Sequence, residues 1–320
     1  MGEFKLDFSG IGAAKAGTTW IAGCLGQHPA VCMALRKETN FFLRKHISSI
    51  LPVRRYHDGM AHYDEGLEWY QQKFSHCKPG QLCGEFSNAY LADPESAGLL
   101  HSHNPAMKLL CCLRNPVDTA YAGYYQLSRV QPLPSTFEEF VARYPQLKEY
   151  GRYHHNLQPF LKLFPPQSLR LMLFEDIQTD PVAFYRGICE FLEIDSSFVP
   201  EMVSRRLNTR TVLRSRALRD LRCAVGDFMA STSATRKVRT GLVRLGADKL
   251  ALKLFRLNEK PGTVPPMVPA TRRQLVEFYR KDNEALEKLL NRDLSHWNEC
   301  RDEGAGSKPR ASDREERSLS

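Results

Sequence analysis

A loop of small residues around one lysine lies near the N-terminus, between an apolar run and a helical pattern. It reads Ile11-Gly12-Ala13-Ala14-Lys15-Ala16-Gly17-Thr18-Thr19-Trp20. Small side chains let backbone N–H groups close around an anionic oxygen, and a helix N-terminus adds partial positive charge. A kinase or ATPase P-loop places its lysine directly after the second glycine, where this chain has Thr18. The loop therefore predicts phosphate binding and disfavours hydrolysis of Mg-ATP; a generic strand-to-helix turn is the alternative interpretation.

Four more polar groups follow apolar runs in the same way. They are Lys37-Glu38, Glu85, Arg114-Asn115 and Glu175-Asp176. In an open α/β sheet the ligand crevice lies at the carboxyl ends of the strands. Together with Lys15, these groups predict one shared site.

The runs that precede these polar groups are short and β-rich, as buried parallel strands are. They cover residues 5–11, 31–35, 81–84, 107–113 and 169–174, and helical patterns lie between them. This alternation predicts an α/β fold, with a P-loop-like, mainly parallel five-stranded sheet flanked by helices. From Pro181 onward the pattern is helical, which predicts a helical C-terminal half.

Several of these segments resemble one protein family. Residues 15–20 are similar to the 5′-phosphosulfate loop of sulfotransferases that use 3′-phosphoadenosine 5′-phosphosulfate (PAPS), and residues 109–124, around Arg114-Asn115-Pro116, resemble their 3′-phosphate box. Residues 37–42 and 66–70 resemble the glycan (heparan-type) and bacterial branch of that family. The resemblance spans residues 4–300 and includes two nucleotide motifs in the right order, which makes it specific.

The resemblance implies transfer of a sulfuryl group from PAPS, as co-substrate, to a hydroxyl or amine of a small-molecule, lipid or glycan acceptor. Glu38 would be the catalytic base that an acceptor hydroxyl needs within hydrogen-bond reach, and Lys15 would stabilise the negative charge that grows on the leaving phosphate oxygen. The chemistry needs no metal, and we expect none. The implied donor cradle consists of Lys15, Ala16, Gly17, Thr18, Thr19, Trp20 and Arg114.

Two of these assignments have structural alternatives. Trp20 would stack on adenine, but a core aromatic on the first helix is an equally consistent interpretation. Glu38 is either the base or a solvated loop carboxylate beside Lys37.

The sequence departs from the family pattern at several positions. Ala122 stands where a serine is usual and Thr119 where an arginine is common, so Ser128, Thr119 or the basic segment described next would have to help Arg114 hold the 3′-phosphate. Phe86 stands where the glycan branch often has a lysine. A pseudoenzyme that binds PAPS without turnover is therefore an alternative.

The net charge of +9 belongs to one segment of the 320-residue chain. Residues 203–260 hold 15 Lys and Arg against 4 acidic residues, a net +11, and we call them the basic segment. They could supply cations to the nucleotide and an acidic acceptor, contact a membrane surface, or form solvated helix faces. Because both nucleotide motifs lie outside the basic segment, we expect no nucleic-acid partner. A P-loop kinase and a binder of anionic surfaces are the remaining alternatives.

The cysteines, the apolar runs and the two ends of the chain indicate the compartment and the domain organisation of the protein. The nine cysteines show no CxxC or Cys/His metal spacing, which favours reduced thiols in a cytoplasm. No apolar run approaches the ~20 residues of a membrane span, and no secretory signal is visible at the N-terminus. We expect one domain over residues 1–300, with the basic segment inside it, and a disordered tail over residues 301–320, which have almost no apolar content.

Overall fold

A computed structural model shows how these segments assemble. The structure describes residues 4–44, 61–205, 211–232, 235, 257–262 and 264–300. Residues 206–210, 233–234 and 236–256 of the basic segment and the expected tail over residues 301–320 lie outside the described residues.

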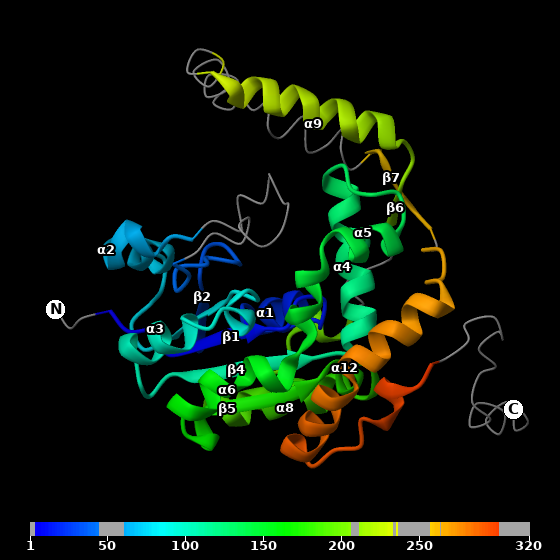
Figure 1. Ribbon diagram of the computed structural model, residues 1–320. Helices are drawn as coiled ribbons and strands as arrows, with labels where there is room; N and C mark the ends of the chain where they lie inside the picture. The colour runs from blue at the N-terminus through cyan, green and yellow to red at the C-terminus, as the bar shows by residue number, and fades with distance from the viewer. Residues whose placement is uncertain are drawn as a thin grey trace, which may run out of the picture.

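The centre of the protein is a five-stranded parallel sheet, which confirms the predicted α/β class (Figure 1). Its strands follow the spatial order β2-β3-β1-β4-β5, and every neighbouring pair is parallel. All five predicted runs form these strands: β1 Phe8–Gly12, β2 Val31–Met33, β3 Leu82–Phe86, β4 Lys108–Leu113 and β5 Leu169–Leu173.

Helices connect the strands and cover the sheet. The α-helices are α1 Thr18–Leu25, α2 Gly66–Gln71, α3 Ser96–His103, α4 Pro116–Val130, α5 Phe137–Arg143, α6 Tyr153–Leu163, α7 Phe174–Thr179, α8 Pro181–Leu192, α9 Arg216–Ser231 and α12 Pro269–Leu290. Short 3₁₀ helices lie at Tyr63–Glu65, Gln72–Phe74, Tyr90–Ala92, Pro145–Gly151, Pro166–Ser168, Glu201–Ser204 and Ser295–Asn298.

Local sequence signals explain where the helix beside the site begins. The side chain of Asn115 accepts hydrogen bonds from the N–H groups of Val117 and Asp118, so it caps α4. Pro116 occupies the first position of the helix, where its missing N–H costs nothing. Asn115 is therefore a structural residue, and Arg114 directly before it is placed at the end of β4.

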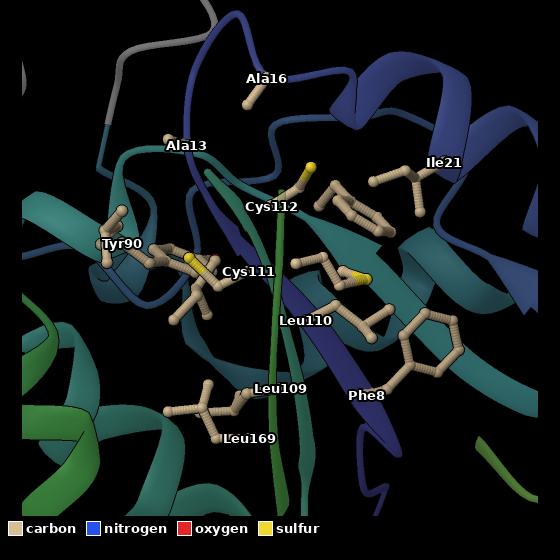
Figure 2. Close-up of a cluster of buried hydrophobic side chains, with 14 of the residues drawn as sticks. Phe8, Ala13, Ala16, Ile21, Tyr90, Leu109, Leu110, Cys111, Cys112 and Leu169 are labelled. Carbon is tan, nitrogen blue, oxygen red and sulfur yellow. The ribbon is translucent and has the colours of Figure 1, made fainter. Parts of the chain in front are cut away.

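The core lies on both faces of the sheet, which explains the nearly continuous apolar runs (Figure 2). Every residue of β1 is buried, and so are Leu109–Leu113 of β4. The ring of Phe86 packs directly on Gly10, and that of Phe8 on Gly84, where a Cβ atom would overlap the ring. These two glycines therefore let β1 and β3 carry large aromatic side chains.

The C-terminal half is helical, as predicted, but it also contains two short strands. β6 Thr211–Leu213 and β7 Glu259–Pro261 pair antiparallel. Each has three residues, too few to produce a recognisable alternation of polar and apolar side chains. This small sheet carries α9, which extends away from the main body in Figure 1. Among the described residues, no helix is long and apolar enough to cross a bilayer.

The expectation that all cysteines are reduced is wrong for one pair. Cys32 of β2 and Cys77 form a disulfide, with Cα atoms 5.5 Å apart. The two residues are 45 positions apart in the sequence, so their spacing did not reveal the pair. The other seven cysteines form no disulfide, and burial raises the pKa of the thiols of Cys24, Cys111 and Cys112 among them.

Candidate active site

The predicted anion loop connects β1 to α1. Gly17 precedes the helix with a φ of 83°, and a Cβ there would lie 2.7 Å from the side chain of Ile177, so only glycine fits. Lys15 also has a positive φ, of 63°. The N–H groups of Thr18 and Thr19 lie in the first turn of α1, where a helix leaves its amides without intrahelical partners. The loop therefore presents backbone donors at the edge of the sheet where parallel strands end.

Lys15 lies in a group of cations. Its Nζ donates to Oε1 of Gln126 on α4, at 2.7 Å. Burial lowers the pKa of Lys15, and the positive charges of Arg114, Arg129 and Lys37 lower it further. Two of these four cations are paired with carboxylates, Lys37 with Glu38 and Arg129 with Glu259. A polyanion near Lys15 would lower the remaining repulsion among the cations.

Glu38 lies beside this group in a defined geometry. Its carboxylate accepts hydrogen bonds from the backbone N–H of Asn88 at 2.9 Å and from Nδ2 of the same residue at 2.6 Å, and it pairs with Nζ of Lys37 at 2.6 Å. The backbone N–H of Glu38 donates to the carbonyl of Phe86 at 2.8 Å. The side chain keeps 22% of its surface exposed. The carboxylate is thus held in position and still open to an acceptor, which a freely solvated loop carboxylate is not.

A buried polar cluster supports the segment that carries Glu38. Glu85, at the end of β3, is fully buried and accepts hydrogen bonds from the hydroxyls of Thr39, Ser87 and Tyr90. The Ser87 hydroxyl in turn accepts from the N–H of Asn40 at 3.0 Å. Burial raises the pKa of Glu85, against the opposing effect of these hydrogen bonds. Glu85 was expected at the shared site, but the structure places it in the core beneath the Glu38 segment.

Arg114 joins the loop from β4. Its Nη1 donates to the carbonyl of Lys15 at 3.2 Å, and its guanidinium lies 4.9 Å from the ring centroid of Phe174. The expected substitutes for the missing family contacts lie differently. Ser128 donates its hydroxyl to the carbonyl of Tyr125 within α4, and Arg219 of the basic segment contacts the carbonyl of Ser128 instead of the loop.

Two site residues on α4 were missed from the sequence. Gln126 contacts Lys15 directly, and Arg129 lies one turn further along the same helix, on the same face. Nε and Nη2 of Arg129 both bind Oε1 of Glu259 on β7. No motif in the sequence marks Gln126 or Arg129, because only the contact of Gln126 with Lys15 shows which face of α4 is turned to the loop.

The remaining predicted residues make defined contacts within the fold. Trp20 is 6% exposed and lies against Phe184, with ring centroids 6.0 Å apart, and its stacking on adenine stays a prediction. At the end of β5, Glu175 accepts from Nε1 of Trp297, and Asp176 pairs with Arg292 at 2.9 Å. Of the five strand ends, those carrying Lys15, Lys37-Glu38 and Arg114 are brought together.

The fold and the site define a class of protein: a P-loop-like α/β protein with an anion cradle and an adjacent carboxylate. Residues 11–243 match the family model of the sulfotransferase domain, which is most of the chain. The chain therefore belongs to the sulfotransferase domain family, as the sequence resemblance implied.

Individual relatives agree with this assignment. Heparan sulfate glucosamine 3-O-sulfotransferase 6 of Mus musculus is 28% identical over 191 residues, 57% of this chain and 50% of that protein. Heparan sulfate glucosamine 3-O-sulfotransferase 5 of Homo sapiens is 27% identical over 196 residues, 58% of this chain and 52% of that protein. The chain thus spans about half the length of the curated relatives it matches.

A solved structure confirms the fold over nearly the whole chain. A sulfotransferase from Alicyclobacillus acidocaldarius superimposes with a TM-score of 0.63, covering 92% of this chain and all of that one, at 24% identity. At this level of identity the similarity establishes the sulfotransferase fold alone. The chain is a sulfotransferase-family protein with a P-loop-like parallel sheet.

Proposed function

We propose that this protein transfers a sulfuryl group from PAPS to a hydroxyl or amine of its acceptor. The observation that carries the proposal is the contact of Arg114 with the Lys15 carbonyl in the Gly-containing loop, with Glu38 held beside Lys37. The charges of Arg114, Arg129 and Lys37 also act on Lys15 and lower its pKa. A bisphosphorylated donor supplies several negative charges that these cations can bind. The lysine position in the loop disfavours Mg-ATP as the donor.

The residues divide the reaction between them. The acceptor oxygen or nitrogen forms a bond to sulfur while the bond from sulfur to the bridging 5′-phosphate oxygen breaks, and adenosine 3′,5′-bisphosphate leaves. Glu38 takes the proton of the acceptor. Lys15 and the N–H groups at the start of α1 stabilise the charge that grows on the leaving oxygen. Arg114 holds the 3′-phosphate by charge-assisted hydrogen bonds.

For the acceptor, we propose a hydroxyl of a glycan, in preference to a small molecule or lipid. The support is that curated relatives of this chain are named as glucosamine 3-O-sulfotransferases of heparan sulfate. Phe86, buried in the core, stands where the glycan branch often has a lysine. We therefore expect a glycan that differs from heparan sulfate in its charge.

Two measurements test the proposal. Calorimetry should show binding of adenosine 3′,5′-bisphosphate without magnesium, and tighter binding than that of Mg-ATP; the reverse order would reject the donor. Incubation with ³⁵S-labelled PAPS and a panel of glycans, phenols, sterols and amines should then label one acceptor class. Donor-product binding with no labelled acceptor in any class would favour a binding protein without turnover.

A further inference from the structure

The helix α9 presents an apolar face that nothing else in the described structure covers. Four large side chains on it are exposed: Leu218 by 49%, Leu221 by 61%, Val225 by 53% and Phe228 by 66%. Their spacing places them within about 80° of one another around the helix axis. They form one stripe along the helix, which we call the α9 stripe.

The opposite side of α9 is its attachment to the protein. Arg219 and Cys223 are buried there and contact the carbonyls of Ser128 and Val130 at the end of α4. These two residues lie about 160° around the helix from the middle of the α9 stripe. Figure 1 shows the helix extending past α4, away from the sheet. The stripe is therefore turned outward, and it is not the contact face of the helix.

The charges around the α9 stripe indicate which kind of surface binds it. Arg222 is exposed and borders the stripe, whereas Asp220 and Asp227 lie on the far side of the helix. The helix belongs to the basic segment, which carries a net +11. Arg222 also donates from Nη2 to the carbonyl of Val130, at 2.9 Å. An exposed apolar stripe with an arginine at its border, within a segment of net positive charge, is consistent with a helix that lies in the interface of an anionic bilayer. Nucleic acid could bind the cations through its phosphates, but the four apolar side chains would then stay in water.

We propose that α9 docks on a bilayer surface that carries anionic lipid, with the α9 stripe in the interface. The contact is interfacial, since no described helix is suited to cross a membrane. The attachment of α9 to α4, the helix that contributes Gln126 to the site, would hold the sulfotransferase site at a fixed distance from that surface. The proposal concerns a surface separate from the donor cradle, so its test is independent of the test of the proposed reaction.

The test is sedimentation of the full chain with vesicles. We expect the protein to sediment with vesicles of phosphatidylcholine and phosphatidylserine in equal amounts, much less with phosphatidylcholine alone, and less in high salt. In the double variant L221D/F228D the vesicle partition coefficient should fall about tenfold or more, because the variant places carboxylates in the interface. Leu289→Asp makes the same change at another exposed leucine, on α12, and should sediment as the wild type does.

Several results would overturn the proposal. One is failure of the wild type to sediment with the mixed vesicles, and another is unchanged sedimentation of the double variant. An unfolding temperature lowered in L221D/F228D but not in L289D would show that the stripe packs against the protein's own chain. Self-association of the wild type that the double variant lacks, without vesicle binding, would assign the face to a second copy.

Discussion

Glu38 owes its position to its backbone as much as to its side chain. It has a φ of 61°, a conformation uncommon outside glycine, and Asn40 two residues on has a φ of 50°. The hydrogen bonds of Glu38 to Asn88 and Phe86 tie this conformation to the end of β3. The carboxylate is therefore fixed before any acceptor arrives, which favours its role as a base.

Replacing Glu38 by Gln tests this role directly. Gln keeps the size of the side chain but cannot accept a proton, so we expect turnover to fall by roughly 10²–10⁴-fold. The affinity for adenosine 3′,5′-bisphosphate, measured by calorimetry, should stay close to that of the wild type. Turnover that persists in the variant would reject the assignment of the base.

Lys15 predicts a pH dependence of donor binding. Because burial and neighbouring cations lower its pKa in the free protein, Lys15 loses its proton at a lower pH than an ordinary lysine does. Donor affinity should therefore fall as the pH rises through this lowered pKa. Titration calorimetry over a pH series measures the effect, and Lys15→Arg, whose guanidinium stays charged, should remove it. Lys15→Ala should lower turnover by about 10²–10³-fold.

At the scale of elements, α4 and β7 are joined by the ion pair of Arg129 and Glu259. Both side chains are mostly buried, with 30% and 16% of their surfaces exposed. In the free protein Glu259 neutralises Arg129, whose charge acts on Lys15. The pair therefore competes with the donor for the charge of Arg129.

Substitutions at the two residues should have opposite effects on donor binding. Arg129→Gln removes a cation from the loop and should weaken binding of adenosine 3′,5′-bisphosphate by about tenfold, the effect of losing one charge-assisted hydrogen bond. Glu259→Gln releases Arg129 and should strengthen binding. If both variants weaken binding equally and lower the unfolding temperature, the pair is only structural.

The Glu85 cluster is a second contact between elements, and its pH dependence can be predicted. The pKa of Glu85 is raised in the folded protein, so the fold binds this proton more tightly than the unfolded chain does. The corresponding stability is present at acidic pH and is lost as the pH rises from the unfolded pKa to the raised one, by about 1.4 kcal/mol for each unit of difference. Glu85→Gln should remove this slope from urea unfolding measured over a pH series. A variant with the slope of the wild type would contradict the assignment.

At the scale of the whole molecule, the disulfide connects the edge strand to the following helical segment. Cys32 is in β2, directly before the segment that carries Glu38, and Cys77 follows the 3₁₀ helix Gln72–Phe74. The bond closes a loop of 45 residues in the unfolded chain. Closing a loop of this size lowers the entropy of the unfolded chain and stabilises the fold.

The variant Cys32→Ser should lower the free energy of unfolding by about 2–4 kcal/mol. Chemical denaturation with and without a thiol reductant measures this difference, and the reductant should lower the stability of the wild type but not of the variant. Equal stability of the wild type under both conditions would mean that the two thiols are not paired in solution.

Local sequence determined the strands, the α/β class and the Gly-containing loop of Lys15, because each depends on neighbours in the chain. Short, continuous apolar runs are typical of strands that are buried on both faces of a parallel sheet. Gly17 can adopt its positive φ because glycine has no Cβ atom. Lys15, Glu38 and Arg114 were assigned from short segments and from the family resemblance of those segments, and their roles stay predictions.

Only the tertiary structure decided which of the chemically suitable residues meet. Arg129 lies 114 positions from Lys15, Glu259 lies 130 positions from Arg129, and Cys77 lies 45 positions from Cys32. Glu85 and Lys37-Glu38 both follow strands, yet one is buried under the site and the other lies in it. Contacts over such separations depend on how helices pack across the sheet, and this packing is the sum of many small interactions along the whole chain.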